Sequence, residues 1–241
     1  MGPRWGCLSV DPSTRFVVAW SSGRSEEEAA PKVVRLTRQR THGRVGILWV
    51  SDGRAVYRRE VRRTYRDPQR TGRRRGRPPL GPTPGVGLTQ AVKRRRRGRV
   101  VGVEVRVVWG ELAKVPYPVH EERLNGVLRD RLNALTRKTH AFAKDPRTWE
   151  ALVTLCLMEH NWLRPHPALR EPAEGLPHGR RYRRRTPAMA IGLADQVWSW
   201  EEFLTFRYYH YLRSDYPWIA PPFSATDSSW DLARRKASSG S

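Results

Sequence analysis

Asp52 and Glu122 are the residues of this chain whose types and surroundings best fit phosphoryl-transfer chemistry. Asp52 follows the apolar run 46–50, which is typical of a buried strand, and Glu122 stands at the head of a basic amphipathic helix. In open α/β sheets ligands bind outside the carboxyl ends of the strands, where carboxylates from separate elements can converge. Such carboxylates can hold two Mg²⁺ ions about 3.5–4 Å apart. We therefore predict Mg²⁺ or Mn²⁺ as the cofactor, with Asp52 and Glu122 as catalytic metal ligands. The ordinary alternatives are a turn residue at Asp52 and, at Glu122, a surface residue favoured by the helix dipole.

The overall charge of the chain indicates a polyanionic partner. Its 241 residues include 46 Lys and Arg against 23 Asp and Glu, which gives a formal net charge of +23. A surface this basic attracts polyanions, and nucleic acid is the commonest one. A ribosomal-type protein, or the arginine bias of a GC-rich genome, would give a similar composition.

Cysteine content and hydropathy bear on the location of the protein. Cys7 and Cys156 lie far apart, without metal-ligand spacing and among apolar neighbours, so we expect free thiols in a reducing compartment. The sequence contains no window of about 18 apolar residues that could span a membrane. We therefore expect a cytoplasmic, nucleoid-associated protein without a membrane partner.

Periodicity and capping residues predict the elements that must position the two carboxylates. We expect strands at 5–10, 15–20, 46–50 and 100–109, and helices at 25–40, 54–65, from about 120 onward, and from 145. Short helices are expected after Thr186 and Trp198. Residues 67–99 are rich in Arg, Pro and Gly and show no periodicity, so we predict a mobile basic arm there, and we expect the tail from Lys236 to be disordered.

Several motifs, in this order along the chain, resemble those of the DDE-type transposases of bacterial insertion sequences, most closely the insertion-sequence-one type. The matching segments are Val50-Ser51-Asp52-Gly53 with Tyr57, Glu122-Arg123-Leu124-Asn125 with Leu128-Arg129, Arg137-Lys138-Thr139 followed by Ala141-Phe142-Ala143-Lys144, His160-Asn161-Trp162-Leu163-Arg164-Pro165-His166, and Thr186-Pro187-Ala188-Met189-Ala190 running into Asp195-Gln196-Val197-Trp198-Ser199. Together they cover nearly the whole chain.

The resemblance implies an α/β fold of the RNase H-like type, a mixed sheet flanked by helices, with a C-terminal helical extension and the basic disordered arm. It implies residues 1–66 and 100–170 as the two parts of the catalytic core, 67–99 as an insertion, and 171–241 as a basic linker, short helices and tail. It also implies metal-dependent DNA strand cleavage and strand transfer on transposon ends and target DNA by a homo-oligomer. Asp52 matches the family's second carboxylate, and Glu122, rather than Glu121, matches its third.

The resemblance also assigns DNA contacts. Arg129 corresponds to a basic residue that approaches the DNA phosphates in the family, and we expect Arg123, Asn125 and Lys138 in the matching motifs to contact DNA as well. Arg75 and Arg77 lie in Arg75-Gly76-Arg77-Pro78, which resembles an AT-hook that enters the minor groove. A phosphate-binding tail without sequence preference is the simpler interpretation of that segment.

The family's first carboxylate has no clear counterpart. It lies in an Asp-Glu-Leu/Met-Trp-type motif on an earlier strand, whereas this sequence begins at what resembles the next strand. Asp11 is either a turn residue or a substitute ligand. We therefore expect a truncated transposase that neither cleaves nor joins DNA alone. A non-enzymatic DNA- or RNA-binding protein derived from the transposase fold is the alternative, and a structural ribonucleoprotein component is a third hypothesis.

Overall fold

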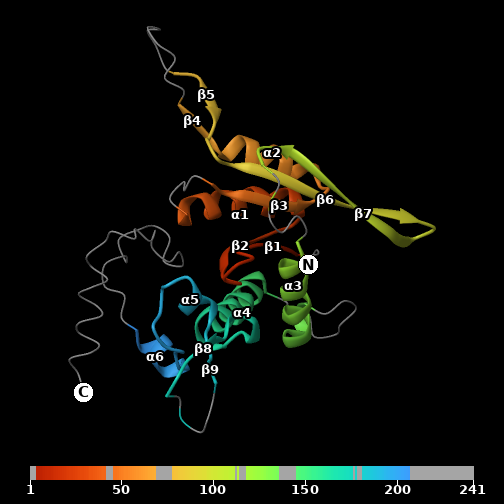
Figure 1. The fold of residues 1–241 in the computed structure, drawn as a ribbon. Helices are drawn as coiled ribbons and strands as arrows, with labels where there is room; N and C mark the ends of the chain where they lie inside the picture. The colour runs from red at the N-terminus through yellow and green to blue at the C-terminus, as the bar shows by residue number, and fades with distance from the viewer. Residues whose placement is uncertain are drawn as a thin grey trace.

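The computed structural model describes residues 4–41, 46–68, 78–111, 113, 118–135, 145–175, 177 and 181–206 (Figure 1). The predictions made for Arg75, Arg77, Lys138 and the tail from Lys236 lie outside these residues.

The chain begins with an antiparallel hairpin of β1 (Trp5–Val10) and β2 (Val17–Gly23). Asp11 closes its turn, because its carboxylate accepts hydrogen bonds from the Ser13 amide at 3.0 Å and from the Thr14 hydroxyl at 2.7 Å. The predicted first strand is confirmed, and the second begins two residues later than predicted. Asp11 therefore acts as a turn residue, which is one of the two roles expected for it.

Two helices follow the hairpin and confirm the sequence prediction. Helix α1 spans Glu26–Arg40, and the Ser25 side chain caps it by accepting a hydrogen bond from the Glu28 amide. The acids at the start of α1 favour the helix because they lie at the positive end of its dipole. Helix α2 spans Ala55–Thr64 and buries Val56 and Val61.

The central sheet is mixed. Its strand order is β3–β6–β7, with β3 (Leu48–Asp52) parallel to β6 (Gly87–Arg96) and β6 antiparallel to β7 (Arg99–Trp109). A smaller antiparallel pair consists of β4 (Arg66–Pro68) and β5 (Leu80–Pro82). The predicted strand at 100–109 is confirmed. The prediction that 67–99 lacks regular structure is wrong for β5 and β6. Strand pairing with β3 and β7 stabilises β6, although its arginine-rich second half shows no alternation of apolar and polar residues.

The second half of the described chain is mainly helical. It contains α3 (Val119–Arg131), a 3-10 turn at Asn133–Leu135, α4 (Pro146–Met158), a π-helical turn at Glu159–Leu163, a 3-10 turn at Pro167–Leu169, the strand pair β8 (Glu171–Pro172) and β9 (Tyr182–Arg183), α5 (Pro187–Ala190) and α6 (Trp200–Thr205). Asp145 caps α4 through the Thr148 amide, as its position before Pro146 predicts.

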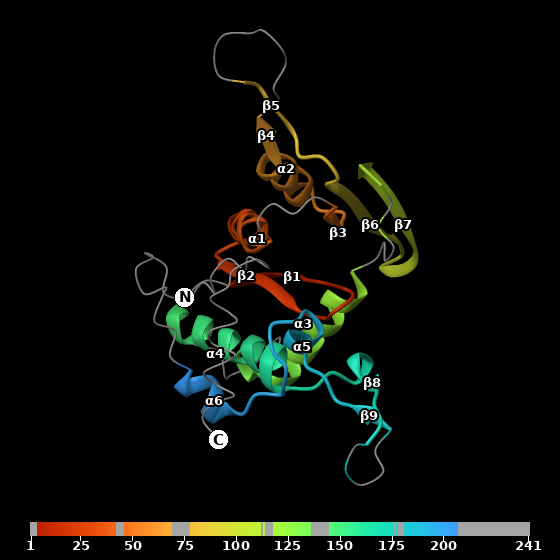
Figure 2. The same ribbon diagram turned by 60° about the vertical axis from the view of Figure 1, so that its left-hand side comes forward.

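The β1–β2 hairpin is covered by helices on both faces (Figures 1 and 2). On one side a cluster that includes Cys7, Ala19, Val33 and Val34 packs the hairpin against α1, and this cluster continues through α2 to Trp49 and Tyr65. On the other side Val17 and Trp20 pack against α3 and α4 through the apolar residues Leu124, Leu128, Trp149, Val153 and Leu157. The apolar face of α3, which carries Leu124 and Leu128, is therefore a packing surface, as expected for an amphipathic helix.

Asn161 links the π-helical turn to β2. Its side-chain oxygen accepts a hydrogen bond from the Val17 amide at 2.9 Å, and its side-chain nitrogen donates to the Val17 carbonyl at 3.1 Å. Because Asn161 is only 1% exposed, these bonds satisfy polar groups that water does not reach. The Asn-Trp-Leu-Arg-Pro-His motif thus has a structural role in holding the hairpin.

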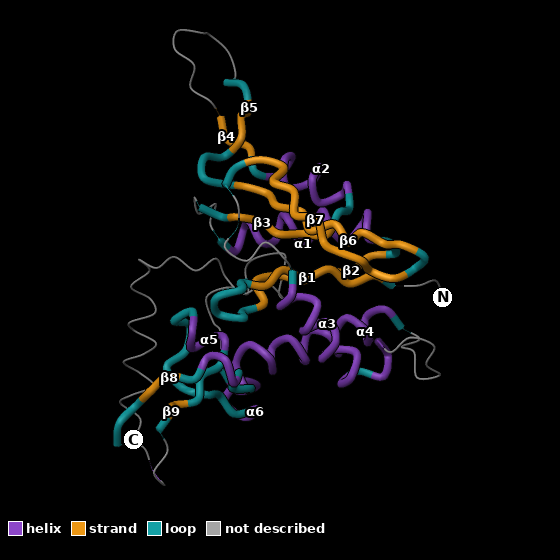
Figure 3. The backbone as a smooth tube through the Cα atoms, turned by 45° about the vertical axis from the view of Figure 1, so that its right-hand side comes forward, coloured by secondary structure: helices purple, strands orange, loops and turns teal. Residues whose placement is uncertain are grey.

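The described part of the chain is a mixed α/β structure whose strands form separate sheets. Strands β1 and β2 lie apart from β3, β6 and β7 (Figure 3), and the two groups are not hydrogen-bonded to each other. Side chains from both groups nevertheless contribute to one apolar cluster. None of the described helices is both long and apolar enough to cross a membrane.

Candidate functional site

Asp52 is the last residue of β3, where it is exposed at the carboxyl end of the strand. Its Oδ1 accepts a hydrogen bond from the Arg54 amide at 3.1 Å. Gln90 Nε2 donates to the backbone carbonyls of Asp52, at 2.8 Å, and of Arg54, at 3.0 Å. The turn after β3 is therefore fixed from β6, and the Asp52 carboxylate is presented at the edge where ligands bind in α/β sheets.

Glu121 lies in the first turn of α3 and is the carboxyl group of the site most affected by its surroundings. Burial raises the pKa of Glu121 to about 7, a hydrogen bond from Asn125 acts against this rise, and the charges of Glu122 and Asp52 add to it. Asp52 and the start of α3 are thus within electrostatic range of each other, although β6 and β7 lie between them in the sequence.

Glu122 has a different environment. Its Oε1 lies 2.6 Å from Nζ of Lys93, a residue of β6, and its side chain is 41% exposed. The sequence predicted Glu122, and not Glu121, as the metal ligand. The role of Glu122 in metal binding stays a prediction. The structure adds Glu121 as a candidate, and the signal in the sequence was the adjacent pair of glutamates at the helix head.

The three residues of α3 that were predicted to contact DNA have different surroundings. Asn125 donates a hydrogen bond to Glu121, so it positions that carboxyl group. Arg123 and Arg129 are both exposed. The positive charge of Arg129 lowers the pKa of Glu121, so Arg129 interacts electrostatically with this carboxyl group.

Glu26 and Cys7 lie near Asp52 and were not predicted as site residues, whereas Tyr57 belongs to the same sequence motif as Asp52. Burial and the charge of Asp52 raise the pKa of Glu26, which also pairs with Arg54 at 3.4 Å. The Tyr57 hydroxyl donates to Cys7 Sγ at 3.5 Å, and burial raises the pKa of this thiol. We call Glu26, Asp52, Glu121 and Glu122 the acidic cluster. Glu26 was interpreted as a helix-dipole residue, because nothing in the sequence shows that α1 starts near the end of β3.

The histidines do not contribute to the acidic cluster. His160 Nε2 lies 2.9 Å from the carbonyl oxygen of Arg15, and burial lowers the pKa of this histidine. Its ring makes an edge contact with His166, at 6.4 Å between centroids. Both histidines therefore belong to the packing of their loop. Within the described residues no group of at least three His, Cys, Asp or Glu side chains is arranged to hold a metal ion.

No protein-family model, curated protein or solved structure matches this chain. A functional assignment therefore depends on the residues and their geometry.

Proposed function

We propose that this chain is the catalytic part of a DDE-type transposase, which acts in metal-dependent DNA strand cleavage and strand transfer. The observation that carries the proposal is the way β6 connects Asp52 to the start of α3, on a chain whose formal net charge is +23. Ala91 of β6 is the register partner of Asp52, and Lys93 of the same strand forms an ion pair with Glu122, which is next to Glu121. A buried carboxyl group in the field of other carboxylates favours a bound cation. The motif order described above, and a mixed sheet with helices beside it, support an RNase H-like core.

The donor atoms of the acidic cluster suit Mg²⁺ or Mn²⁺ in kind, because these ions prefer carboxylate oxygens. Asp52 and Glu121 would hold the ion, and Glu122 would join them after release from Lys93. A bound divalent ion polarises a phosphate oxygen and activates the attacking water or hydroxyl. The residues of the chain would then orient the DNA: Arg129 and Arg123 are exposed on the same helix as the two glutamates.

We also propose that the chain is incomplete as a catalyst. Among the described residues β3 pairs with β6 on one edge and with no strand on the other, as expected if the family's first strand is not supplied. Asp11 is engaged in its turn and does not contribute to the electrostatic environment given above for Glu121. The active form would be a nucleoid-associated homo-oligomer.

Manganese binding tests the acidic cluster. The purified chain is titrated with Mn²⁺ and free Mn²⁺ is followed by electron paramagnetic resonance. Asp52→Asn and Glu121→Gln should each weaken binding by roughly tenfold, which corresponds to about 1.4 kcal/mol. Glu171→Gln is the control, because Glu171 pairs with Arg185 in the C-terminal part. Equal affinity in all four proteins would contradict the proposal.

A DNA cleavage assay tests the proposal that the chain is incomplete as a catalyst. The chain alone, with Mg²⁺ and supercoiled plasmid, should produce no nicked or joined product. Robust Mg²⁺-dependent cleavage that Asp11→Ala abolishes would overturn this part of the proposal.

A non-enzymatic DNA- or RNA-binding protein is the alternative function. It is favoured by one observation, the lack of a three-ligand metal group within the described residues. If Mn²⁺ does not bind at millimolar concentration while nucleic acid binds, this alternative is correct.

A further inference from the structure

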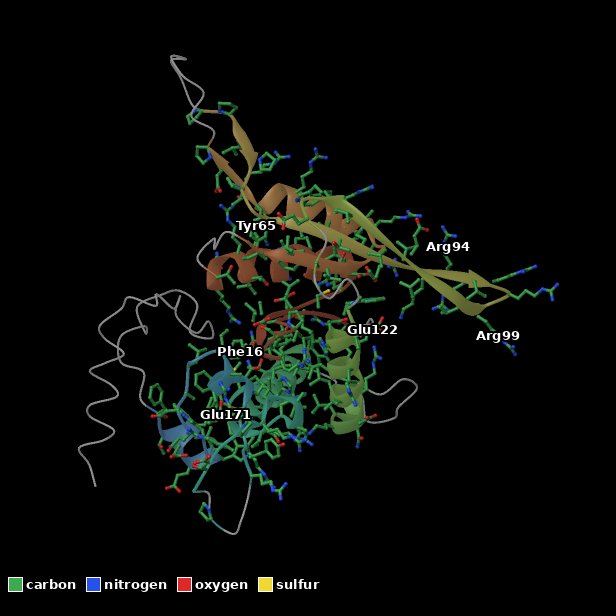
Figure 4. All side chains as sticks on the ribbon, in the orientation of Figure 1. Phe16, Tyr65, Arg94, Arg99, Glu122 and Glu171 are labelled. Carbon is green, nitrogen blue, oxygen red and sulfur yellow. The ribbon has the colours of Figure 1, made fainter. Side chains whose placement is uncertain are left out.

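The hairpin of β6 and β7 extends away from the body of the protein (Figure 1), and Figure 4 shows Arg94 and Arg99 on it. Its turn is rich in arginine. We call Arg94, Arg95, Arg96, Arg97 and Arg99 the arginine tip. Arg97 and Gly98 form the turn with positive φ angles of 49° and 78°, as in the tight turns that match the twist of a two-stranded ribbon. The tip is therefore part of a paired hairpin, whose register brings its arginines close together along the chain.

The charges of the tip are not balanced within the described part of the chain. Arg96 and Arg99 are cross-strand neighbours, and like charges at such positions destabilise a hairpin. Arg95, Arg96, Arg97 and Arg99 form no ion pair with any carboxylate of the described residues. Arg96, Arg97, Arg99 and Val101 line an open hollow. A polyanion bound here would relieve the repulsion.

The ribbon also presents apolar side chains beside the arginines. Val100, Val101 and Val103 are 48%, 63% and 43% exposed. A two-stranded ribbon fits the major groove of B-DNA, which is about 12 Å wide, and there arginine can bind guanine while apolar side chains contact thymine methyl groups. Exposed arginine and valine side by side on a narrow ribbon suit that groove better than they suit a phosphate surface alone.

Glu104 positions the guanidinium groups of Arg94, at the base of the tip, and of Arg106 on the neighbouring strand. Its Oε2 accepts a hydrogen bond from Arg94 at 2.7 Å, and its Oε1 accepts one from Arg106 at 2.7 Å. A single carboxylate between two arginines leaves this part of the ribbon positively charged while restricting both side chains.

The ribbon begins at the acidic cluster. Ala91 of β6 is the register partner of Asp52, and Lys93 pairs with Glu122 (Figure 4). From Ala91 to Arg96 the strand rises roughly 17 Å, at about 3.3 Å per residue. DNA bound along the hairpin would therefore lie next to the acidic cluster.

We propose that the β6–β7 hairpin is a DNA-binding ribbon that enters the major groove of duplex DNA and holds it beside the acidic cluster. This inference rests on the proposed function for the choice of DNA as the partner, and it does not require catalysis.

The test compares two triple variants of equal charge in the full chain. Arg95→Gln/Arg96→Gln/Arg99→Gln removes charge from the tip and spares the turn residue Arg97. Arg58→Gln/Arg62→Gln/Arg63→Gln removes the same charge from exposed positions of α2. Binding to a mixed-sequence DNA duplex is measured by fluorescence anisotropy in EDTA, from roughly 50 to 200 mM salt.

The tip variant should bind at least roughly tenfold more weakly, and its salt dependence should fall by about one unit of slope for each phosphate that it no longer neutralises. The α2 variant should change affinity less than about threefold. Circular dichroism and thermal unfolding show that each variant is folded. Equal weakening in both variants would mean that only net charge matters and would overturn the proposal.

Two further measurements separate the possible outcomes. An A-form RNA duplex of the same sequence, whose deep and narrow major groove excludes a ribbon, should bind more weakly and should not distinguish the tip variant from the wild type. Equal sensitivity of RNA binding to the tip variant would overturn the groove assignment. Anisotropy in EDTA measures DNA binding without a metal ion, whereas the Mn²⁺ titration measures the acidic cluster without DNA, so failure of the metal-site proposal and failure of the ribbon proposal give different results.

Discussion

Lys93 on β6 and Glu122 on α3 form an ion pair with 2.6 Å between Nζ and Oε1. The pair connects the base of the basic hairpin to the residue that sequence analysis selected as a metal ligand. An exposed ion pair contributes little to stability, so its main effect is on the charge of the acidic cluster. A cation entering the cluster would compete with Lys93 for Glu122, and DNA bound to the hairpin would lie close to the same lysine.

Replacing Lys93 tests whether Glu122 takes part in cation binding. Lys93→Met should raise the Mn²⁺ affinity by roughly tenfold, because it removes a positive charge from beside Glu122. When Glu122 is already replaced by Gln, adding Lys93→Met should leave the Mn²⁺ affinity unchanged. Lys32→Met is the matched control, since Lys32 forms an exposed ion pair with Glu28 at 2.8 Å on α1. An unchanged affinity in Lys93→Met would exclude Glu122 from the site.

The pKa of Glu121 predicts a pH-dependent stability. Its pKa is raised from 4.5 to about 7 in the folded protein, so the folded state binds the proton more tightly than the unfolded state. The stabilisation from this proton is complete below about pH 4.5 and is lost as the pH rises through about 7. The free energy of unfolding that is lost through ionisation of Glu121 is on the order of 3 kcal/mol at most.

Glu121→Gln should remove this dependence, because the amide keeps the hydrogen bond with Asn125 and does not ionise. Urea unfolding at pH 5 and pH 8.5 would show similar stabilities for variant and wild type at the lower pH, and a more stable variant at the higher pH by roughly 1–3 kcal/mol. Glu122→Gln should not reproduce this change. If the free energies of unfolding of Glu121→Gln and the wild type differ by the same amount at both pH values, the pKa of Glu121 is not raised in the folded protein.

Local signals predicted most elements of the fold. The N-cap of α1 at Ser25 and the Asp145-Pro146 start of α4 depend on neighbours in the sequence, and both helices formed where expected. The strand predicted at 46–50 formed two residues later, at Leu48–Asp52, so Asp52 belongs to the strand and does not follow it. Strand β6 was missed because its second half is exposed and basic. Its conformation depends on hydrogen bonding to β3 and β7, which a local pattern does not reveal.

The candidate site was predictable only in part, for the same reason. Asp52 and the glutamate pair carry a recognisable sequence context, whereas Glu26 and Cys7 join them because of how α1, β1 and β3 pack. Likewise, the choice between Glu121 and Glu122 depends on which face of α3 meets the sheet. Both residues belong to one turn, so helical spacing alone does not decide between them.

Asn161 is expected to be essential for stability. Asn161→Leu leaves the Val17 amide and carbonyl without their side-chain partners in a buried position, which costs roughly 2–4 kcal/mol. Asn133→Leu, at an exposed position in the turn after α3, should cost less than about 1 kcal/mol. Chemical denaturation of both variants measures the difference. Equal costs would show that Asn161 does not hold β2.

Asp11→Ala separates the turn role from a ligand role. Removal of the hydrogen bonds from Ser13 and Thr14 should lower the free energy of unfolding by about 1 kcal/mol, because the turn is exposed and water replaces part of the interaction. Mn²⁺ affinity should stay at the wild-type value, whereas Asp52→Asn should weaken it without a comparable decrease in stability. Asp11→Asn serves as the control, because its amide oxygen can still accept the hydrogen bond from the Ser13 amide and its amide nitrogen can donate to the Thr14 hydroxyl oxygen, which should preserve most of the turn. A drop in Mn²⁺ affinity for Asp11→Asn as large as that for Asp52→Asn would make Asp11 the missing ligand, and the chain would then hold a complete set of carboxylates.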